Sequence, residues 1–182
     1  MRYWLAGALE ARPLADAPDL AAPSVVAALA AAGLDREVGV VAIDPALSDT
    51  AANQEAYGVP TEALANCVVV GGRRDGQERV AACVVLASTR ADVNGVVKRV
   101  LDVRKASFLP HEDAVERTGM EHGGITPFGL PDGWRVLVDA AVVAQPVLVM
   151  GSGVRASKLL LDGSVLPRVP GVEVVDDLGR RA

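Results

Sequence analysis

The apolar residues of this chain come in short runs, because Asp, Arg, Gly or Pro interrupts each longer stretch. No run approaches the roughly 18 apolar residues that a membrane-spanning helix requires. The 182 residues are 51% hydrophobic and 23% charged, which is the composition of one compact globular domain. Two cysteines are too few for a disulfide scaffold. Because no basic and then apolar leader opens the sequence, we expect a cytoplasmic protein.

The short runs alternate with turn signals and predict many short strands with small helices between them. β-Branched residues with Gly or Pro boundaries predict strands at 37–43, 66–70, 80–87, 105–108, 135–139, 147–150, 155–161 and 172–175. Helical spacing, N-cap residues and terminal glycines predict helices at 24–32, 50–58, 92–101 and 110–119. Residues 71–78 are expected to form a longer hairpin loop. The pattern indicates a compact α+β fold built on a mixed sheet or barrel.

No linker divides the chain. We therefore expect residues 38–182 to form a single globular unit, with residues 1–37 as an N-terminal arm and helix that pack on it. The arm contains Tyr3 and Trp4, and we expect it to cover one edge of the core.

The charge is unevenly distributed. The net charge is −5 at pH 7, and residues 1–57 hold three basic and eight acidic residues. Residues 90–105 carry five basic and two acidic residues, among them Lys98, Arg104 and Lys105. Such a patch can hold a few phosphates. It is equally typical of a solvated helix face, on which Lys98 pairs with Asp102 one turn away. The acidic balance of the whole chain argues against a DNA partner.

Residues 119–131 contain four glycines and two prolines in thirteen positions, which is a long and conformationally costly loop. Successive glycine N–H groups can form a concave array that binds an anion or a developing oxyanion. No Gly-Lys-Ser/Thr follows, so the loop is not a P-loop, and the glycine spacing of a dinucleotide-binding turn is absent. An ordered surface loop without a ligand stays open as an alternative.

This loop resembles the signature of the YbaK/EbsC family, which is related to the editing domain of prolyl-tRNA synthetase. The run Gly-Gly-Ile-Thr-Pro-Phe-Gly at 123–129 is the most specific part of the resemblance. The segments at 52–59, 65–70, 103–108, 138–139 and 151–153 match the family pattern in the same order. The resemblance covers residues 38–177.

The resemblance implies a deacylase that hydrolyses the ester between a wrong amino acid and its tRNA, with a small amino acid on a proline or related tRNA as one candidate substrate. It also implies a barrel-like mixed α/β domain in which a small pocket selects the amino acid by size. The expected partners are a tRNA acceptor end and an aminoacyl-tRNA synthetase. We expect no membrane partner, no cofactor and no metal, because no Cys/His cluster has the spacing of a zinc site.

The resemblance and the neighbouring residues together give a set of candidate site residues. Asn66, Gly123 and Gly124 are the catalytic candidates. The substrate-binding candidates are His122, Ile125, Thr126, Pro127, Phe128, Asp139, Gly151, Ser152 and Gly153. The tRNA-contact candidates are Lys98, Arg104 and Lys105. The hypothesis requires Asn66, Gly123 and Gly151 to line one cavity.

The sequence departs from the family pattern at one important position. Where the family places a lysine at the start of a strand, this chain has Asn66. An amide donates hydrogen bonds but carries no positive charge. A catalytically inactive module that binds an aminoacyl-tRNA end, an amino acid or a nucleotide is therefore the alternative function. His122 could compensate as a base, whereas Cys67 and Cys83 in apolar strands are expected to be inert.

Overall fold

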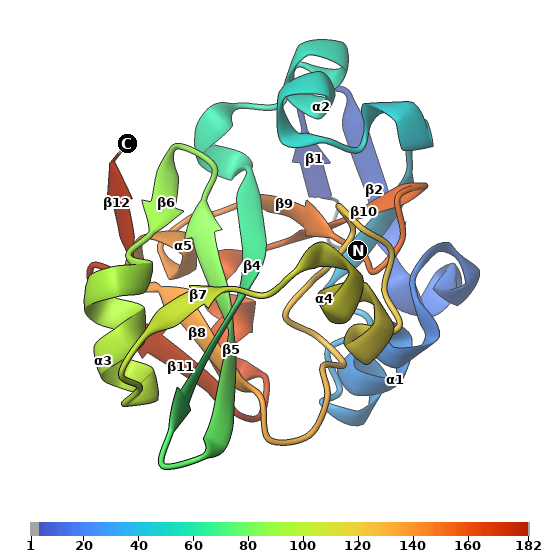
Figure 1. The fold of residues 1–182 in the computed structure, drawn as a ribbon. Helices are drawn as coiled ribbons and strands as arrows, with labels where there is room; N and C mark the ends of the chain where they lie inside the picture. Colours follow the sequence, from blue (N-terminus) through green and yellow to red (C-terminus); the bar gives the residue numbers. More distant parts are fainter. Residues whose placement is uncertain (1–3, 182) are drawn as a thin grey trace.

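Two five-stranded sheets carry the fold, which a computed structural model describes for residues 4–181 (Figure 1). The first sheet has the order β1 (Trp4–Ala6), β2 (Leu9–Pro13), β3 (Gly39–Ala42), β10 (Ser157–Leu161) and β9 (Leu148–Gly151). The second has the order β11 (Val172–Val175), β8 (Arg135–Asp139), β5 (Gln77–Leu86), β4 (Ala65–Arg74) and β7 (Ala106–Phe108). A ribbon of β6 (Thr89–Ala91) and β12 (Gly179–Arg181) stands beside them. The expected α+β class is confirmed.

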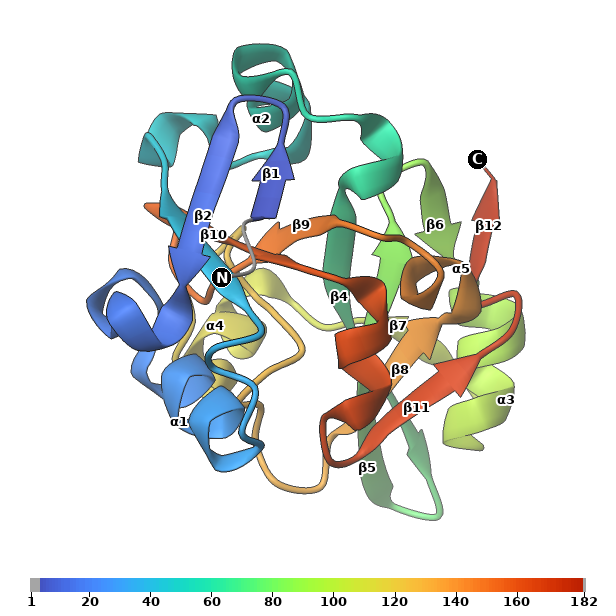
Figure 2. The same ribbon diagram turned by 180° about the vertical axis from the view of Figure 1, so that it is seen from behind.

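The helices are short and lie around the sheets. They are α1 (Pro23–Ala31), α2 (Thr50–Tyr57), α3 (Lys98–Leu101), α4 (His111–Thr118) and α5 (Ala140–Val143). Figures 1 and 2 show α3 on one side of the molecule, with α1 and α4 on the other. The helix expected at 92–101 begins as a wider π-helical turn, Val93–Val97, before it continues as α3. In the described part of the chain, no helix has the length and apolar character to cross a bilayer.

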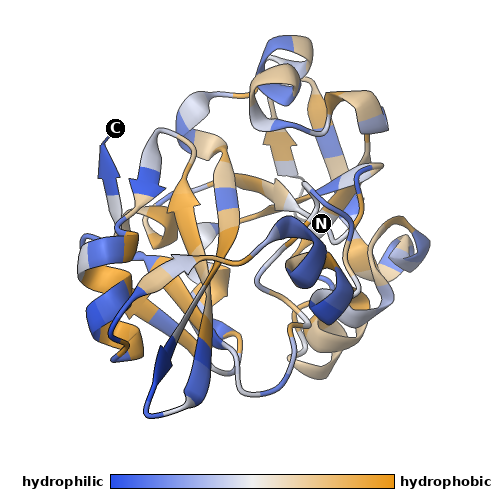
Figure 3. Cartoon of the chain, in the orientation of Figure 1, coloured by the Kyte–Doolittle hydropathy of each residue, from blue (hydrophilic) through white to orange (hydrophobic). Residues whose placement is uncertain are grey.

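The central strands of the second sheet are apolar on both faces over much of their length, because both faces are covered there. Cys67 of β4 packs against the core between the two sheets, whereas Val68 and Val70 pack against the core beneath α3. Figure 3 shows mostly hydrophobic colour along β5 and the upper part of β4, interrupted on β4 by one hydrophilic band, with hydrophilic colour at the far end of their hairpin. This two-sided burial explains why the sequence of β4 shows no polar alternation.

The hairpin between β4 and β5 is tighter than expected. The strands run on to Arg74 and restart at Gln77, so a two-residue turn, Asp75 with Gly76, replaces the loop expected at 71–78. Both turn residues have positive φ angles, 51° and 80°, which suit the twist of a two-residue hairpin. Gly72 stays in the strand because β7 passes close to it, and a Cβ there would lie 2.5 Å from the Lys105 carbonyl oxygen.

The N-terminal segment contributes two strands that the sequence analysis did not predict. β1 and β2 form a hairpin, and β2 extends the first sheet by pairing Arg12 with Val40 of β3. Their alternating burial brings Trp4 and Leu9 into a core with Leu160 of β10. Tyr3 lies outside the described residues. The strand β12 was also missed, whereas α1, α4 and the strands β3 and β7 to β11 lie where they were expected.

Trp4 and Leu5 offer a test of this docking, since Trp4 is 4% exposed and its neighbour Leu5 is 63% exposed. Trp4→Ala is expected to lower the free energy of unfolding by about 3 kcal/mol, because it leaves a cavity between β1 and the sheet. Leu5→Ala is the matched control and should change it by less than about 0.5 kcal/mol. Urea unfolding measures both; equal effects would contradict the docked hairpin.

Candidate functional site

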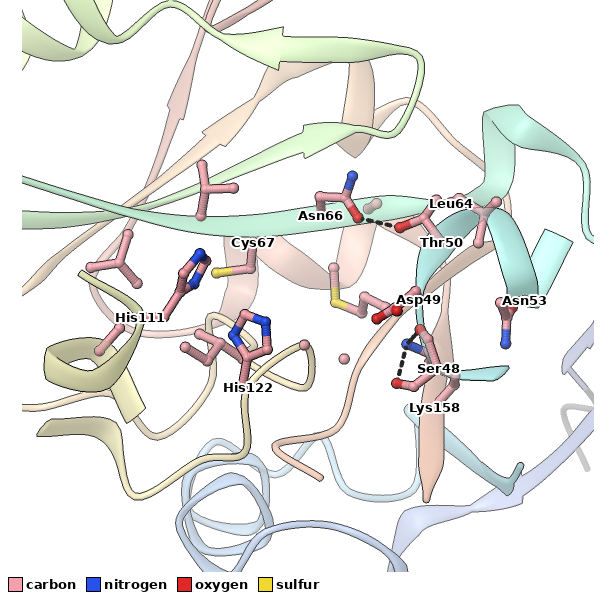
Figure 4. A pocket seen from close by; sticks show the side chains of 18 of the residues that line it. Ser48, Asp49, Thr50, Asn53, Leu64, Asn66, Cys67, His111, His122 and Lys158 are labelled. Atoms are coloured by element: carbon pink, nitrogen blue, oxygen red, sulfur yellow. Dashed lines mark hydrogen bonds between the residues drawn. The ribbon is translucent and has the colours of Figure 1, made fainter. Parts of the chain in front are cut away.

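A cavity of about 520 Å³ opens where the two sheets separate. Its walls come from the start of α2, the first half of β4, the β7–α4 connection, the glycine-rich loop, β9 and β10. Figure 4 shows Cys67, His111 and His122 towards one end and Ser48 and Lys158 towards the other. Residues distant in the sequence therefore share one chamber of the size typical of small-molecule sites.

The cavity exists because β9, the edge strand of the first sheet, meets the start of β4, which β7 does not cover there, and then diverges from it. Leu64, just before β4, forms an isolated parallel bridge with Val149 of β9. Further along β4, the Val69 carbonyl accepts a hydrogen bond of 2.9 Å from the Leu109 amide. Because backbone groups point to the same edge at every second residue, the Cys67 amide and carbonyl face the gap between these contacts. The gap thus offers backbone donors and acceptors to a ligand.

The glycine-rich loop closes one wall of the cavity by packing against the β9–β10 turn. The Gly153 amide donates to the Gly124 carbonyl at 2.8 Å. A Cβ at Gly151 would lie 2.4 Å from the Gly124 carbonyl oxygen and 2.8 Å from the Ile125 carbonyl oxygen. The two backbones can approach this closely only because position 151 carries no side chain.

Arg155 links two segments of the cavity wall through hydrogen bonds. Its Nη1 atom donates to Oδ1 of Asp49 and to the His122 carbonyl, each at 3.2 Å, and its Nη2 atom donates to the Pro45 carbonyl at 3.2 Å. Asp49 precedes α2 as expected, yet its carboxylate makes no capping bond and pairs with Arg155 instead. This guanidinium therefore joins the start of α2 to the glycine-rich loop.

Lys158 places an ammonium in the cavity, and the sequence analysis missed it. The residue is 7% exposed, and its Nζ atom donates to the Ser48 carbonyl at 2.7 Å and lies 3.3 Å from Ser48 Oγ (Figure 4). Burial lowers its pKa to about 8, nearby Arg155 lowers it as well, and Asp49 opposes both effects. The sequence signal was a single lysine that directly precedes the three leucines of β10.

Two aromatic features mark the cavity at the end away from Lys158. The rings of His111 and His122 meet edge to face, with their centroids 4.4 Å apart. Phe108, at the end of β7, lines the cavity and is 58% exposed. An exposed aromatic ring beside a cavity suits contact with a flat ligand group.

Comparison with known proteins decides the family of this domain. A family model described as an aminoacyl-tRNA editing domain matches residues 44–169, more than half of the chain. The chain belongs to the aminoacyl-tRNA editing domain family. The resemblance seen in the sequence is thereby confirmed.

Solved structures agree on the fold of this editing domain. Hypothetical protein APE2540 has 20% sequence identity and a TM-score of 0.74, and the match covers 86% of this chain and 99% of that one. A protein proposed as a trans-editing enzyme for prolyl-tRNA synthetase has 20% identity and a TM-score of 0.71, with 85% and 96% of the two chains covered. A search of the curated proteins finds no significant match.

The structure brings five of the twelve catalytic and substrate-binding candidates together. Asn66, His122, Gly123, Ile125 and Gly151 line the same cavity. Asn66 leaves β4 on the side opposite to Cys67, and its Oδ1 atom accepts a hydrogen bond of 2.9 Å from the hydroxyl of Thr50 (Figure 4). The three positions that the hypothesis required to meet, 66, 123 and 151, do meet.

Other predicted residues lie behind the cavity wall rather than on it. Gly124 and Gly153 carry the loop contact described above, and Ser152 is fully buried and bonded to Ser157 Oγ at 2.7 Å. The remaining loop residues, Thr126, Pro127 and Phe128, are buried and outside the lining. Phe128 belongs to the main core, so these residues shape the loop from beneath.

Asp139 lies outside the cavity lining. Its Oδ1 atom accepts a hydrogen bond from the Ala141 amide at 2.7 Å and its Oδ2 atom accepts one from the Gly179 amide. Both carboxylate oxygens therefore accept from backbone amides, so Asp139 caps α5 and does not face the cavity.

The basic candidates also lie outside the cavity lining. Lys98 begins α3. This helix packs on the core that contains Val70 of β4, and not on the core between the two sheets. Arg104 and Lys105 are exposed in the turn before β7. Their role in tRNA contact stays a prediction.

The thiols are unsuited to nucleophilic chemistry. Cys67 lines the cavity, but burial raises its pKa far above the usual range, and Cys83 adds to this effect. Burial also raises the pKa of Cys83 to about 12. Both cysteines are free, and each faces a valine of the opposite strand in the β4–β5 register, Val84 and Val68 respectively.

Gly151→Ala tests the close contact between the loop and the turn. The added Cβ would meet two backbone carbonyls, which cannot rotate away as a side chain could, so we expect a loss of about 1–3 kcal/mol in stability. Gly133→Ala is the control, because Gly133 has a positive φ angle of 82° and open space around it, so it reports backbone strain alone. Thermal unfolding compares the two; a smaller loss at 151 than at 133 would contradict the contact.

Lys158→Met tests the burial of the ammonium. Between pH 8 and 10.5 the unfolded chain binds more protons than the folded chain, since the folded pKa is the lower one. The stability of the wild type therefore rises with pH in this window. The stability advantage of Lys158→Met over the wild type is expected to be largest at pH 7 and to shrink by up to about 3 kcal/mol by pH 10.

Urea unfolding at several pH values measures this difference. Arg36→Met, which removes an exposed guanidinium on the surface, is the control, and its difference from the wild type should stay constant. A constant difference for Lys158→Met as well would show that the ammonium titrates alike in the folded and unfolded chain.

Proposed function

We propose that this domain is an editing deacylase, which hydrolyses the ester between a wrong amino acid and the 3′ end of a tRNA. Membership of the aminoacyl-tRNA editing domain family supports the substrate class. The observation that carries the proposal is the cavity itself, in which Asn66, Gly123 and Gly151 meet beside a buried ammonium. A surface loop without a ligand would not need so close a fit between two glycine turns.

The proposed reaction requires only the ester and a water molecule. A water oxygen attacks the ester carbonyl carbon, the bond from that carbon to the ribose oxygen breaks, and the leaving oxygen takes up the proton that the water loses. The products are a free amino acid and a tRNA with free hydroxyl groups. The cavity offers polar groups for each part: backbone donors at the open edge of β4, an imidazole at His122 and the ammonium of Lys158.

The lining also suggests how a small amino acid is selected. Apolar side chains of Leu64, Ile125, Val149 and Met150 form part of the wall. Val149 and Met150 are 2% exposed and packed on their far sides by other strands, so the wall is rigid. A fixed apolar wall favours small side chains by excluding larger ones. One structural neighbour is proposed to edit for prolyl-tRNA synthetase, so proline tRNA carrying a smaller amino acid is the first substrate to try.

The rest of the tRNA end would leave the cavity past Phe108. Its exposed ring suits stacking against the terminal base, because base stacking on aromatic rings tolerates any base. Arg104 and Lys105 precede the same strand and are exposed, so they are candidates for phosphate contacts, which position a nucleic acid without chemistry. We also propose that an aminoacyl-tRNA synthetase is a second partner of the domain.

The decisive test is deacylation of a panel of aminoacyl-tRNAs. Proline tRNA charged with alanine, serine, cysteine or proline is incubated with the protein, and the remaining ester is measured against a protein-free blank. We expect at least one small amino acid to be released faster than the blank and faster than proline.

A second arm of the same experiment separates catalysis from binding. An adenosine carrying the amino acid through a non-hydrolysable amide should bind the protein. If this analogue binds while no ester on the panel is cleaved faster than the blank, the domain is a binding module, and the deacylase proposal is wrong.

A further inference from the structure

Lys158 stands out among the groups of the cavity. Of the described residues that line it, this is the only lysine or arginine. It enters from β10 of the first sheet, between its strand neighbours Val41 and Gly151, across the cavity from β4. The ammonium is therefore held by a sheet interior rather than by a mobile loop, and its position is well defined.

The ammonium has only neutral hydrogen-bond partners in the structure. Its Nζ atom is bonded to the carbonyl and hydroxyl of Ser48. The nearby carboxylate of Asp49 is engaged by Arg155 instead, at 3.2 Å. Three N–H groups and a full charge are thus incompletely matched, since Asp49 acts on the ammonium without a hydrogen bond to it, and a buried charge without a bonded counter-charge is costly. Such an arrangement is stabilised when a ligand brings an oxygen with partial or full negative charge.

Resting on the proposed function, we propose that Lys158 is a catalytic residue whose ammonium binds the carbonyl oxygen of the ester and stabilises the negative charge that develops there. An aminoacyl ester has such an oxygen at the reacting carbon. A preorganised donor aimed at a developing oxyanion acts strongly in a cavity that excludes water.

The step balances without any further reactant. As the water oxygen bonds to the carbonyl carbon, the carbonyl oxygen becomes an oxyanion and the hydrogen bond from Nζ strengthens. The carbonyl re-forms as the bond to the ribose oxygen breaks, and that oxygen receives the proton lost by the water. Lys158 keeps its own proton throughout, so its contribution requires the charged form.

This requirement gives the pH dependence a definite direction. The pKa of Lys158 is lowered to about 8 by burial and by Arg155. The ammonium therefore loses its charge as the pH rises through about 8, and the protein-catalysed rate is expected to fall there. Besides Lys158, the charged and titratable groups around the cavity are Asp49 before α2, Cys67 of β4, Glu121, Arg155, His111 and His122.

The first experiment measures steady-state deacylation by Lys158→Met and Lys158→Gln on the best substrate of the wild-type panel. We expect kcat to fall by about 100-fold or more, as for the loss of an oxyanion donor, with KM changed less than about threefold. The residual rate should lack the fall above pH 8. Arg36→Met, an exposed charge remote from the cavity lining, is the matched control. A folded Lys158→Met protein with kcat within twofold of the wild type would overturn the inference.

The second experiment needs no variant and no turnover. The chain has three lysines, Lys98, Lys105 and Lys158. Reductive methylation of the wild type with formaldehyde, mapped by mass spectrometry, is carried out with and without the amide-linked aminoacyl-adenosine. We expect the analogue to slow methylation of Lys158 at least fivefold and to leave Lys98 unchanged.

The two experiments separate the possible failures. If the wild type cleaves an ester but Lys158 is neither protected nor required, the inference about Lys158 is wrong and the deacylase proposal stands. If no ester is cleaved, the deacylase proposal and the catalytic role fall together. Protection of Lys158 in that case would identify it as a binding residue of an inactive module.

Discussion

The parallel bridge between Leu64 and Val149 is the contact on which the site depends. It joins β9, at the edge of the first sheet, to the start of β4 in the second sheet at a single point, and beyond it the strands diverge. Had the two strands paired along their whole length, backbone hydrogen bonds would fill the space that is now a cavity. The contact of Gly151 with the Gly124 carbonyl then closes the open side. A small chamber with unpaired backbone groups follows from these two constraints.

Much of this architecture could be predicted from local sequence, because the signals are local. Pro23 and Gly33 bound α1, and Gly119 ends α4 with a positive φ angle of 67°. The loop at 119–131 could be recognised as a candidate site from its glycine and proline content alone. The strands β1 and β2 could not be found this way, since three to five residues with alanine at buried positions carry almost no periodic signal.

The site was predictable only in part, for a physical reason. Glycines at 123 and 151 indicate positions where another backbone segment can come close, but the sequence does not identify that segment. Asp139 ends a strand as a binding residue would, yet its carboxylate caps α5. Lys158 was overlooked because a lysine in a strand ordinarily points to solvent at an edge. Only the tertiary fold shows that β10 lies inside the sheet, between β3 and β9, and that this lysine is buried.

The position of the ammonium bears directly on the choice between an enzyme and an inactive module. The case for inactivity rested on Asn66, which carries no charge where the family pattern has a lysine. That case assumes that the charge must enter the cavity from β4. Here a buried ammonium enters the same cavity from β10, on the other sheet. Stabilisation of an oxyanion depends on where the charge stands relative to the carbonyl, and not on the strand that carries it. Under the proposed role of Lys158, the absence of a lysine at position 66 is compatible with catalysis by this domain.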